Sequence, residues 1–305
     1  MRLRALLGAL ALAASSGAVH AGVTTLSPRL CDWQQPLTAP QQDRLLRVAD
    51  VVRRELESSG GRVALIARSG LNLQRFGIRY SHAGIALKAR ADASWSVRQL
   101  YYACDEGRPR LYDQGLAGFL FGTENPAAGY LSIVLLPGPE ADALERAALH
   151  RPRAIELLAG RYSANAYAFG TTYQNCNQWL AELIASAWGG LDAGDGATLR
   201  ARAQRWLADR AYAPAPVELG SRLLMFAAGF VPWVHTDDHP EDDLAALRFR
   251  TSLPASIEAF VRRQAPQAER LEICHDERRV VIRRGWDAIE DGCIARDGDR
   301  TALLD

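Results

Sequence analysis

Hydrophobic residues follow a helical period in one stretch near the start of the chain. In residues 39–58 they lie three or four positions apart, at Leu45, Val48, Val52 and Leu56. Thr38 and Pro40 are typical of a helix start, and the glycines at positions 60 and 61 are typical of a helix end. The pattern therefore predicts one amphipathic helix.

The pattern changes to short strand-like runs between residues 62 and 136. These runs are "RVALIAR", "SHAGIALKA", "WSVRQLYYA" and "GYLSIVLLP", and clusters of Gly, Asp and Pro separate them. Helical spacing returns in residues 139–158, 176–188, 197–209 and 254–265, and the hairpin-like "RLEICHDERRVVIR" follows. Because helices and strands segregate rather than alternate, we expect an α+β fold.

The composition excludes some classes of partner. The chain has 305 residues, of which 48% are hydrophobic, so it can bury the core of one elaborate domain or two small ones. Its 36 basic and 35 acidic residues nearly cancel, and no basic block carries interleaved aromatic residues. We therefore expect no nucleic-acid partner.

The first 21 residues resemble a cleaved secretory signal. Arg2 and Arg4 precede the apolar run "ALLGALALAASSGA", and Val19, His20 and Ala21 end it with the small residues of a cleavage site. An uncleaved anchor is the alternative, but the run is shorter than the roughly 20 residues of a membrane span. We expect a periplasmic or secreted protein without a membrane span after cleavage.

Export changes the interpretation of the five cysteines. In an oxidising compartment four of them can form two disulfides and leave one thiol. Cys274 ends a strand-like run and Cys293 follows a short connection, which favours pairing between them. Cys31 and Cys104 are then the second candidate pair, and Cys176 is the remaining thiol.

A second apolar stretch, "LLMFAAGFVPWV" at 223–234, is too short to span a membrane. It is interrupted by Gly229 and Pro232. We expect it to line the core or a groove.

Cys176 opens a well-formed helix. Asn175 is a good N-cap, Gln178 completes an Asn-x-x-Gln capping box, and two glycines close the helix at 189 and 190. Helical steps from Cys176 reach Leu180, Leu183, Ile184 and Ala187, so the thiol should point toward the core. The N-terminal end of a helix favours a thiolate and can supply an oxyanion site, as a nucleophile requires.

His82, in "RYSHAGIAL", is the best candidate for a base. In a strand it shares one side with Gly84 and Ala86. These small residues would let a helix pack closely on that side, as a contact between a histidine and a helix-borne cysteine requires. The alternative is that Cys176 and His82 are ordinary packing residues, which is common for both residue types.

The two motifs together resemble a known superfamily. "YSHAGIAL" followed much later by "YQNCNQWLAELI" has the His-before-Cys order of the circularly permuted NlpC-type papain-like proteins, which include lecithin–retinol-acyltransferase-like enzymes. Within it, "YQNCNQW" and "DDHP" at 237–240 resemble a family of exported bacterial proteins of unknown function. The resemblance implies an antiparallel sheet packed against the cysteine-bearing helix.

The signal pattern, the predicted elements and the resemblance together indicate a division of the chain. A permuted papain-like core would occupy 61–190, after a signal peptide at 1–21 and a segment with one helix at 22–60. A C-terminal helical extension and hairpin would occupy 191–305.

Carried over to this sequence, the resemblance makes Cys176 the nucleophile and His82 the general base. A third polar residue should orient the imidazole from the next strand, and Gln99 fits because it alternates with Val97 and Tyr101. Gln99 is equally well interpreted as an ordinary polar strand residue. Further candidates for oxyanion or substrate contacts are Tyr173, Asn175, Asn177 and Gln178, although capping alone explains Asn175 and Gln178.

One rival site is "HTDDHPEDD" at 235–243. Two imidazoles and several carboxylates could hold zinc or manganese. His235 and His239 would share a face only in a helix, whereas Pro240 and the two aspartates indicate a loop. We therefore predict no metal and no cofactor, and we interpret Asp237, Asp238 and His239 as a solvated loop or a wall of the active-site cleft.

The sequence favours acyl transfer through Cys176 and His82, on an amide, ester or thioester. A cell-wall peptide is the leading substrate by analogy within the superfamily. The alternative is a non-catalytic envelope binding module on a papain-like scaffold.

Overall fold

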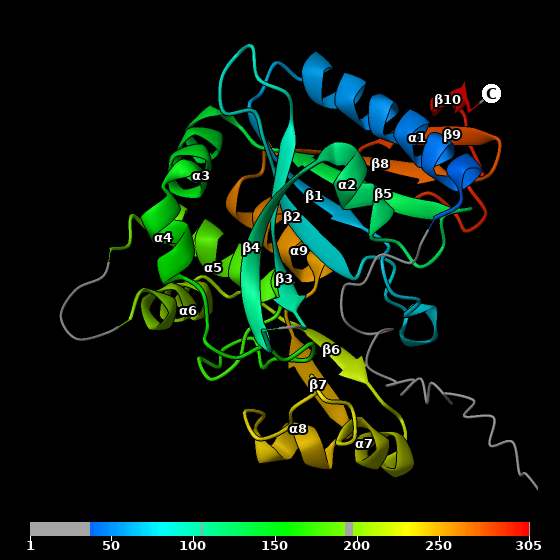
Figure 1. The fold of residues 1–305 in the computed structure, drawn as a ribbon. Helices are drawn as coiled ribbons and strands as arrows, with labels where there is room; N and C mark the ends of the chain where they lie inside the picture. The colour runs from blue at the N-terminus through cyan, green and yellow to red at the C-terminus, as the bar shows by residue number, and fades with distance from the viewer. Residues whose placement is uncertain (1–36, 105, 193–197, 305) are drawn as a thin grey trace, which may run out of the picture.

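The computed structural model describes residues 37–104, 106–192 and 198–304. The expected signal peptide and Cys31 therefore lie outside the described residues. Within them, a large antiparallel sheet has the strand order β10-β9-β8-β5-β1-β2-β3-β4 (Figure 1). Its strands are β1 Val63–Arg68, β2 His82–Leu87, β3 Ser96–Ala103, β4 Arg108–Gly115, β5 Gly129–Leu135, β8 Glu269–His275, β9 Arg279–Arg284 and β10 Arg300–Leu303.

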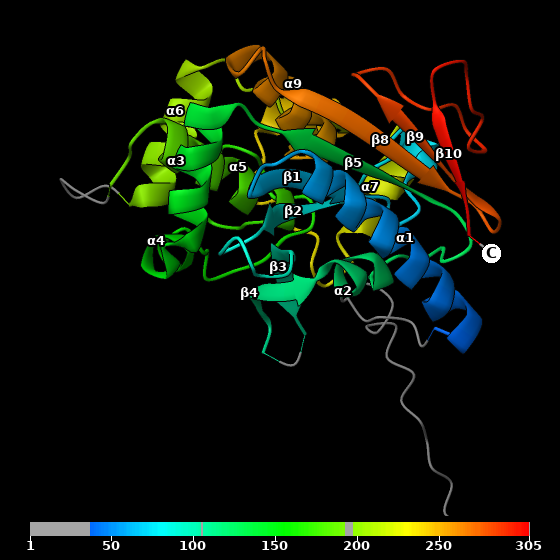
Figure 2. The same ribbon diagram turned by 90° about the horizontal axis from the view of Figure 1, so that it is seen from above.

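Helices cover both sides of this sheet (Figure 2). On one side, which we call the α1 face, helices α1 (Ala39–Ser58) and α2 (Leu116–Phe121) pack on Ala64, Ile66 and Ala86. On the other side, which we call the α5 face, helices α3 (Gly138–Leu149), α5 (Cys176–Trp188) and α9 (Pro254–Gln264) pack on Leu65, Ala83 and Ile85. Alternate residues of each strand therefore enter different cores.

A smaller lobe lies beyond one end of the main sheet (Figure 1). Strands β6 (Ala215–Glu218) and β7 (Arg248–Thr251) form a two-stranded sheet, and helices α7 (Arg222–Ala228) and α8 (Glu241–Ala245) lie beside them. Helix α6 (Leu199–Asp209) packs behind α5. A short 3-10 turn spans Gln74–Phe76.

The predicted α+β class and the predicted helix at 39–58 are confirmed. The helix expected at 139–158 is divided at His150 into α3 and α4 (Arg151–Glu156). Pro152 explains the division, because proline lacks the N–H that a continuous helix needs at that position.

The C-terminal hairpin is not a separate appendage. Strand β8 pairs with β5 along seven residues, from Gly129 opposite His275 to Leu135 opposite Glu269, and β9 and β10 extend the same sheet. The main core therefore includes elements from both sides of the expected boundary at residue 190.

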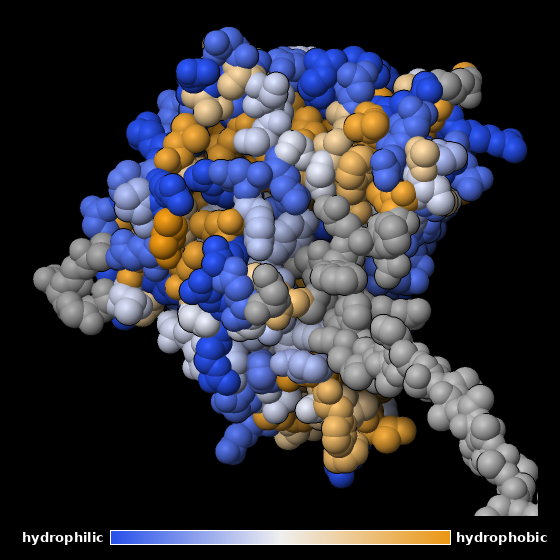
Figure 3. Space-filling model, viewed as in Figure 1, coloured by the Kyte–Doolittle hydropathy of each residue, from blue (hydrophilic) through white to orange (hydrophobic). Residues whose placement is uncertain are grey.

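The sequence predicts that the apolar stretch at 223–234 lines the core or a groove, but several of its large side chains are exposed rather than in the core. Exposed fractions are 74% for Leu223, 66% for Phe226 and 72% for Phe230. Figure 3 shows the resulting apolar surface over α7. Trp233 alone among its large side chains is buried, at 4% exposure. No helix in the described part of the chain is long and apolar enough to cross a membrane.

Candidate functional site

Cys176 occupies the first turn of α5, as predicted. The side-chain Oδ1 of Asn175 accepts a hydrogen bond from the backbone N–H of Gln178 at 2.7 Å, so Asn175 is the N-cap. Cys176 is 8% exposed, is not in a disulfide, and belongs to the same core cluster as Leu180 and Ile184. The thiol is therefore placed at the end of the buried stripe of the helix.

The segment that leads into Cys176 is fixed by a buried ion pair. Arg200 of α6 contacts the carboxylate of Glu182 of α5 at 2.9 Å, and its Nη2 donates to the carbonyl of Tyr173 at 3.0 Å. Gln174 donates to the same carboxylate at 2.6 Å. Burial raises the pKa of Glu182, and Arg200 opposes this effect. These contacts hold the backbone immediately before the cysteine.

The start of α5 is bonded to the start of β2. The side-chain amide of Asn177 donates to the carbonyl oxygen of Ser81 at 3.1 Å. Asn177 follows Cys176 in the chain, and Ser81 precedes His82. This bond brings the segments that carry the two predicted residues to the same end of the sheet.

His82 is held by the predicted orienting residue. Its Nε2 lies 2.8 Å from Oε1 of Gln99 on β3, and Nε2 of Gln99 donates to Oε1 of Gln114 on β4 at 2.9 Å. Because Gln99 thereby presents its oxygen to the ring, Nε2 of His82 carries the proton and Nδ1 carries the lone pair. Tyr101 stacks on the imidazole, with ring centroids 4.8 Å apart.

The imidazole of His82 is uncharged over the ordinary pH range. Burial is the main cause that lowers the pKa of His82 to about 3, and the nearby charge of Arg68 is the second. The hydrogen bond with Gln99 opposes this shift. Arg68 lies directly opposite His82 in the pairing of β1 with β2. An uncharged imidazole can accept a proton, but one with so low a pKa is a weak base.

The side of β2 that meets α5 differs from the expectation. Ala83, Ile85 and Leu87 share the core with α5, whereas Ala86 belongs to the α1 face. The ring of His82 lies 6.0 Å from that of Phe119 in α2, which is also on the α1 face. Gly84 therefore does not make room for α5. A Cβ at Gly84 would lie 2.8 Å from the carbonyl oxygen of Arg98, so the glycine allows β3 to approach closely.

The loop at 233–240 packs on the segment that precedes Cys176. The ring of His235 stacks on Tyr173 with centroids 4.4 Å apart, and the Tyr173 hydroxyl donates to Asp237 at 3.0 Å. Asp238 accepts from the backbone N–H of Tyr167 at 2.9 Å. His239 is 7% exposed. These residues form a largely packed support for the segment before Cys176 rather than a solvated acidic loop.

The same loop does not assemble the rival metal site. Nε2 of His239 lies 2.9 Å from the carbonyl oxygen of Asn165 and therefore acts as a donor, which excludes that nitrogen as a ligand. His235 faces Tyr173. Across the ranges that the structure describes, no three His, Cys, Asp or Glu residues are grouped as metal ligands.

The side chains expected to form an oxyanion site already have partners. Asn175 donates to Thr251 at 2.8 Å, and Gln178 donates to the carbonyls of Tyr167, Ala168 and Gly170. Gln178 therefore does not complete the predicted capping box. Any oxyanion contacts at this helix would come from backbone N–H groups of its first turn other than that of Gln178, which donates to Asn175.

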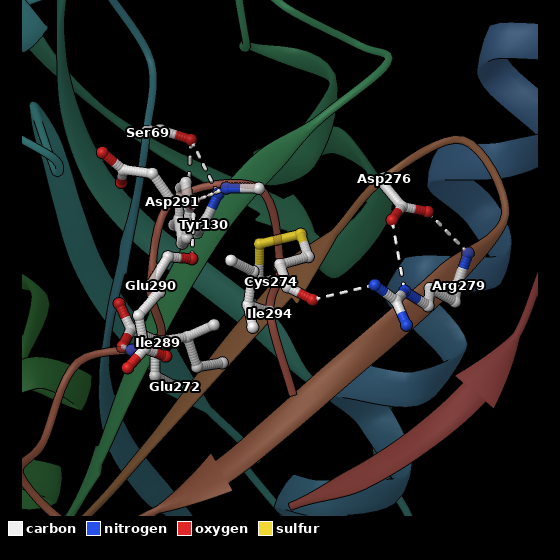
Figure 4. The surroundings of a disulfide bond; sticks show 12 residues. Ser69, Tyr130, Glu272, Cys274, Asp276, Arg279, Ile289, Glu290, Asp291 and Ile294 are labelled. Carbon is white, nitrogen blue, oxygen red and sulfur yellow. Dashed lines mark hydrogen bonds and ion pairs between the residues drawn. A yellow bond between two sulfur atoms is a disulfide. The ribbon is translucent and has the colours of Figure 1, made fainter. Parts of the chain in front are cut away.

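A disulfide supports the segment that leads into His82. Cys274 is bonded to Cys293, as predicted, and Cys104 is also disulfide-bonded. The bond fixes the loop around Ile289 and Glu290, which contacts Glu272 and Tyr130 (Figure 4). Glu272 also accepts from the hydroxyl of Tyr80, just before Ser81 and His82.

Sequence reasoning missed Arg68 and Gln114. Arg68 ends the otherwise apolar strand "VALIAR" and is 3% exposed. The sequence signal for it is a single charged residue at the end of an apolar run. Gln114 belongs to β4, a polar edge strand whose sequence, "RPRLYDQG", has no clear apolar alternation.

No curated protein and no solved structure matches the chain, so the papain-like superfamily has no support from those comparisons. One family profile does match, over residues 55–261, and its description is "Uncharacterized protein conserved in bacteria (DUF2145)". The matched region contains Cys176, His82 and Gln99, but it ends before the Cys274–Cys293 disulfide. Because the match covers more than half of the sequence, the chain belongs to this bacterial family of unknown function.

Proposed function

We propose that the protein is a thiol hydrolase or acyltransferase, with Cys176 as nucleophile and His82 as general base. The observation that carries this proposal is the hydrogen bond between Asn177 and Ser81, because it joins the residue after the nucleophile to the residue before the base. The proposal agrees with the resemblance to permuted NlpC-type papain-like proteins.

The reaction would proceed through a thioester. The sulfur of Cys176 attacks the carbonyl carbon of an amide or ester while its proton passes to Nδ1 of His82. The bond to the leaving group then breaks, and the imidazolium returns the proton to that group. Water or another acceptor resolves the acyl-enzyme by the reverse sequence. Gln99 acts as a positioning residue, because it holds the opposite nitrogen of the ring.

The geometry places one demand on this reaction. Ala83, not His82, faces the core that contains Cys176, so the imidazole must reach the thiol around the end of β2 at Ser81. A shift of the strand end that moves His82 together with Gln99 would accompany substrate binding, because a rotation of the His82 side chain alone would break its hydrogen bond with Gln99. The substrate class that we propose first is an amide of a cell-wall peptide, by analogy within the superfamily and because we expect export.

A non-catalytic binding module is the second candidate. Two observations favour it: Cys176 and His82 are only 8% and 5% exposed, and the pKa of His82 is about 3. In that case both residues would be packing residues of a scaffold whose binding surface lies elsewhere.

Acylation of Cys176 by p-nitrophenyl acetate separates the two candidates. The mature protein, Cys176→Ala and His82→Ala would be incubated with the ester, and peptide mass mapping would locate any acetyl group. We expect acetylation of Cys176 in the wild type and much slower acetylation in His82→Ala. Acetylation of other residues only, or equal rates in the wild type and His82→Ala, would reject the proposed mechanism.

A further inference from the structure

Arg68 differs from the other buried arginines that the structure describes. Arg200 pairs with Glu182 at 2.9 Å, Arg270 with Glu258 at 2.9 Å, and Arg283 with Asp299 at 2.8 Å. Arg68 is the least exposed of the four, at 3%, yet no carboxylate within the described ranges pairs with it. Its charge is therefore buried without an acidic partner.

The hydrogen-bonding capacity of Arg68 is largely unused. Its Nη2 makes a long contact of 3.4 Å with the Tyr101 hydroxyl, and Nε and Nη1 have no partner among the described residues. The guanidinium also lies over the ring of Phe119, 5.3 Å from its centroid. A contact of this type does not replace the hydrogen bonds that a buried guanidinium loses.

Two glycines make room for the guanidinium. A Cβ at Gly70 would lie 2.6 Å from Nη1, and a Cβ at Gly122 would lie 2.3 Å from Nη2. The nearby carboxylate of Glu124 is used elsewhere, because it accepts from the backbone N–H of Asn72 at 2.8 Å. The chain therefore accommodates the Arg68 head group closely without neutralising it.

A buried charge without a partner costs stability, and natural proteins retain such costs mainly at functional sites. We propose that Arg68 is an oxyanion-binding residue, which recognises a carboxylate or phosphate group of a ligand at this end of the sheet. A guanidinium binds both groups through charge-assisted hydrogen bonds.

The location connects this subsite to the candidate catalytic residues. Arg68 lies opposite His82 across the β1–β2 pair, and Gly70 donates to the side chain of Ser81 at 3.1 Å. If the anion belongs to the substrate, this inference rests on the proposed function and makes that substrate acidic. An anion beside Arg68 would also offset the charge that helps to keep His82 a weak base.

Access would come through the segments that cover the guanidinium. Gly70, Ser81 and Gly122 are partly exposed, whereas Arg68 beneath them is buried. Glu124 donates through its backbone to the carbonyl of Gly70 at 3.0 Å, which links the two covering segments. A ligand would enter where these segments separate.

Thermal unfolding of the whole mature protein tests the inference without any need for turnover. The probes are sodium acetate and sodium phosphate, titrated at constant ionic strength against sodium chloride. The variants are Arg68→Met, Arg68→Gln as a second substitution in case the first does not fold, and Arg200→Met as the matched control for a paired buried arginine.

We expect Arg68→Met to raise the Tm of the unliganded protein by roughly 2–4 °C, because it removes an unpaired buried charge, and Arg200→Met to lower it. Acetate or phosphate should raise the Tm of the wild type, with an apparent affinity at least about tenfold weaker in the Arg68 variants. A response to acetate alone identifies a carboxylate ligand, and a response to phosphate alone identifies a phosphate ligand.

Two outcomes would overturn the inference. One is a Tm loss in Arg68→Met that equals the loss in Arg200→Met. The other is an anion response that is absent from the wild type or unchanged in the Arg68 variants. Neither readout depends on Cys176. Anion binding with no acetylation of Cys176 would therefore reject the proposed function but support the anion site at Arg68.

Discussion

Asn177 donates a hydrogen bond of 3.1 Å from its side chain to the backbone carbonyl of Ser81. The bond connects the first turn of a core helix to the beginning of a central strand. It therefore fixes the separation between two segments that are far apart in the sequence and that carry Cys176 and His82.

Asn177→Ala should lower the free energy of unfolding by about 1 kcal/mol, the net contribution of one hydrogen bond. It should also slow the acetylation of Cys176, because the helix start is no longer held to β2. Thr198→Ala is the matched control: it removes the N-cap of α6 at about the same cost and leaves the bond to Ser81 intact. Equal acetylation rates in both variants would show that the bond has only a structural role.

Gln114 should matter through Gln99, although it does not contact the imidazole. Gln114→Leu removes the acceptor that orients the Gln99 amide, so the oxygen of Gln99 is no longer fixed toward His82. We expect acetylation of Cys176 to slow by about fivefold, the equivalent of one hydrogen bond of about 1 kcal/mol. Gln114→Glu retains an acceptor and should keep most of the wild-type rate; a rate as low as that of the leucine variant would contradict this explanation.

The buried histidines should make the fold sensitive to mild acid. Burial, as the largest cause, lowers the pKa of His82 to about 3 and that of His275 to about 4. In the unfolded chain a histidine has a pKa of about 6.5, so between these values the unfolded state binds more protons. The free energy of unfolding should therefore fall as the pH falls below about 6.5, by up to roughly 1.4 kcal/mol per pH unit for each histidine.

Urea unfolding at a series of pH values measures this slope. His275→Phe, which removes one titrating group far from Cys176 in the sequence, should flatten the slope between about pH 6 and pH 5. The slope matters rather than the absolute stability, since the substitution also changes packing. An unchanged slope would show that His275 titrates alike in both states.

The Cys274–Cys293 disulfide should contribute strongly to stability. It closes a segment with a sequence separation of 19, for which chain entropy predicts about 3 kcal/mol. A double substitution to alanine should lower the free energy of unfolding by about that amount and should loosen the contacts of Arg79 with Ile289 and Asp291. Hydrogen exchange at residues 79–82 measures the second effect. Unchanged protection there would show that the disulfide does not stabilise the candidate site.

The elements with a clear apolar period were predictable from the sequence. The helix at 39–58 and the helix that begins at Cys176 have the predicted bounds, because their apolar spacing and end residues agree. Strand β4 was not predictable, because it is an edge strand with exposed polar residues and is held by pairing with β3. Burial of the apolar stretch at 223–234 is a wrong expectation for much of its length, because high hydrophobicity usually indicates burial and here Leu223 and Phe226 are exposed.

The candidate site was predictable in part. The N-cap Asn175 follows from a local pattern, and the contact of Gln99 with His82 follows from alternation on adjacent strands. The side of β2 that meets α5 depends on tertiary packing, which a single strand does not encode. For the same reason the sequence could not indicate that Arg68 is buried opposite His82 without an acidic partner.

The alkylation rate of Cys176 across a pH series, in the wild type and in His82→Ala, tests the central claim most directly. Iodoacetamide is small enough for a thiol of low exposure, and urea-unfolded samples give the intrinsic rate of an ordinary cysteine. We predict that native Cys176 reacts, and that its pH profile shifts and its rate falls in His82→Ala. If native Cys176 is inert, or if the two profiles coincide, Cys176 and His82 do not act together.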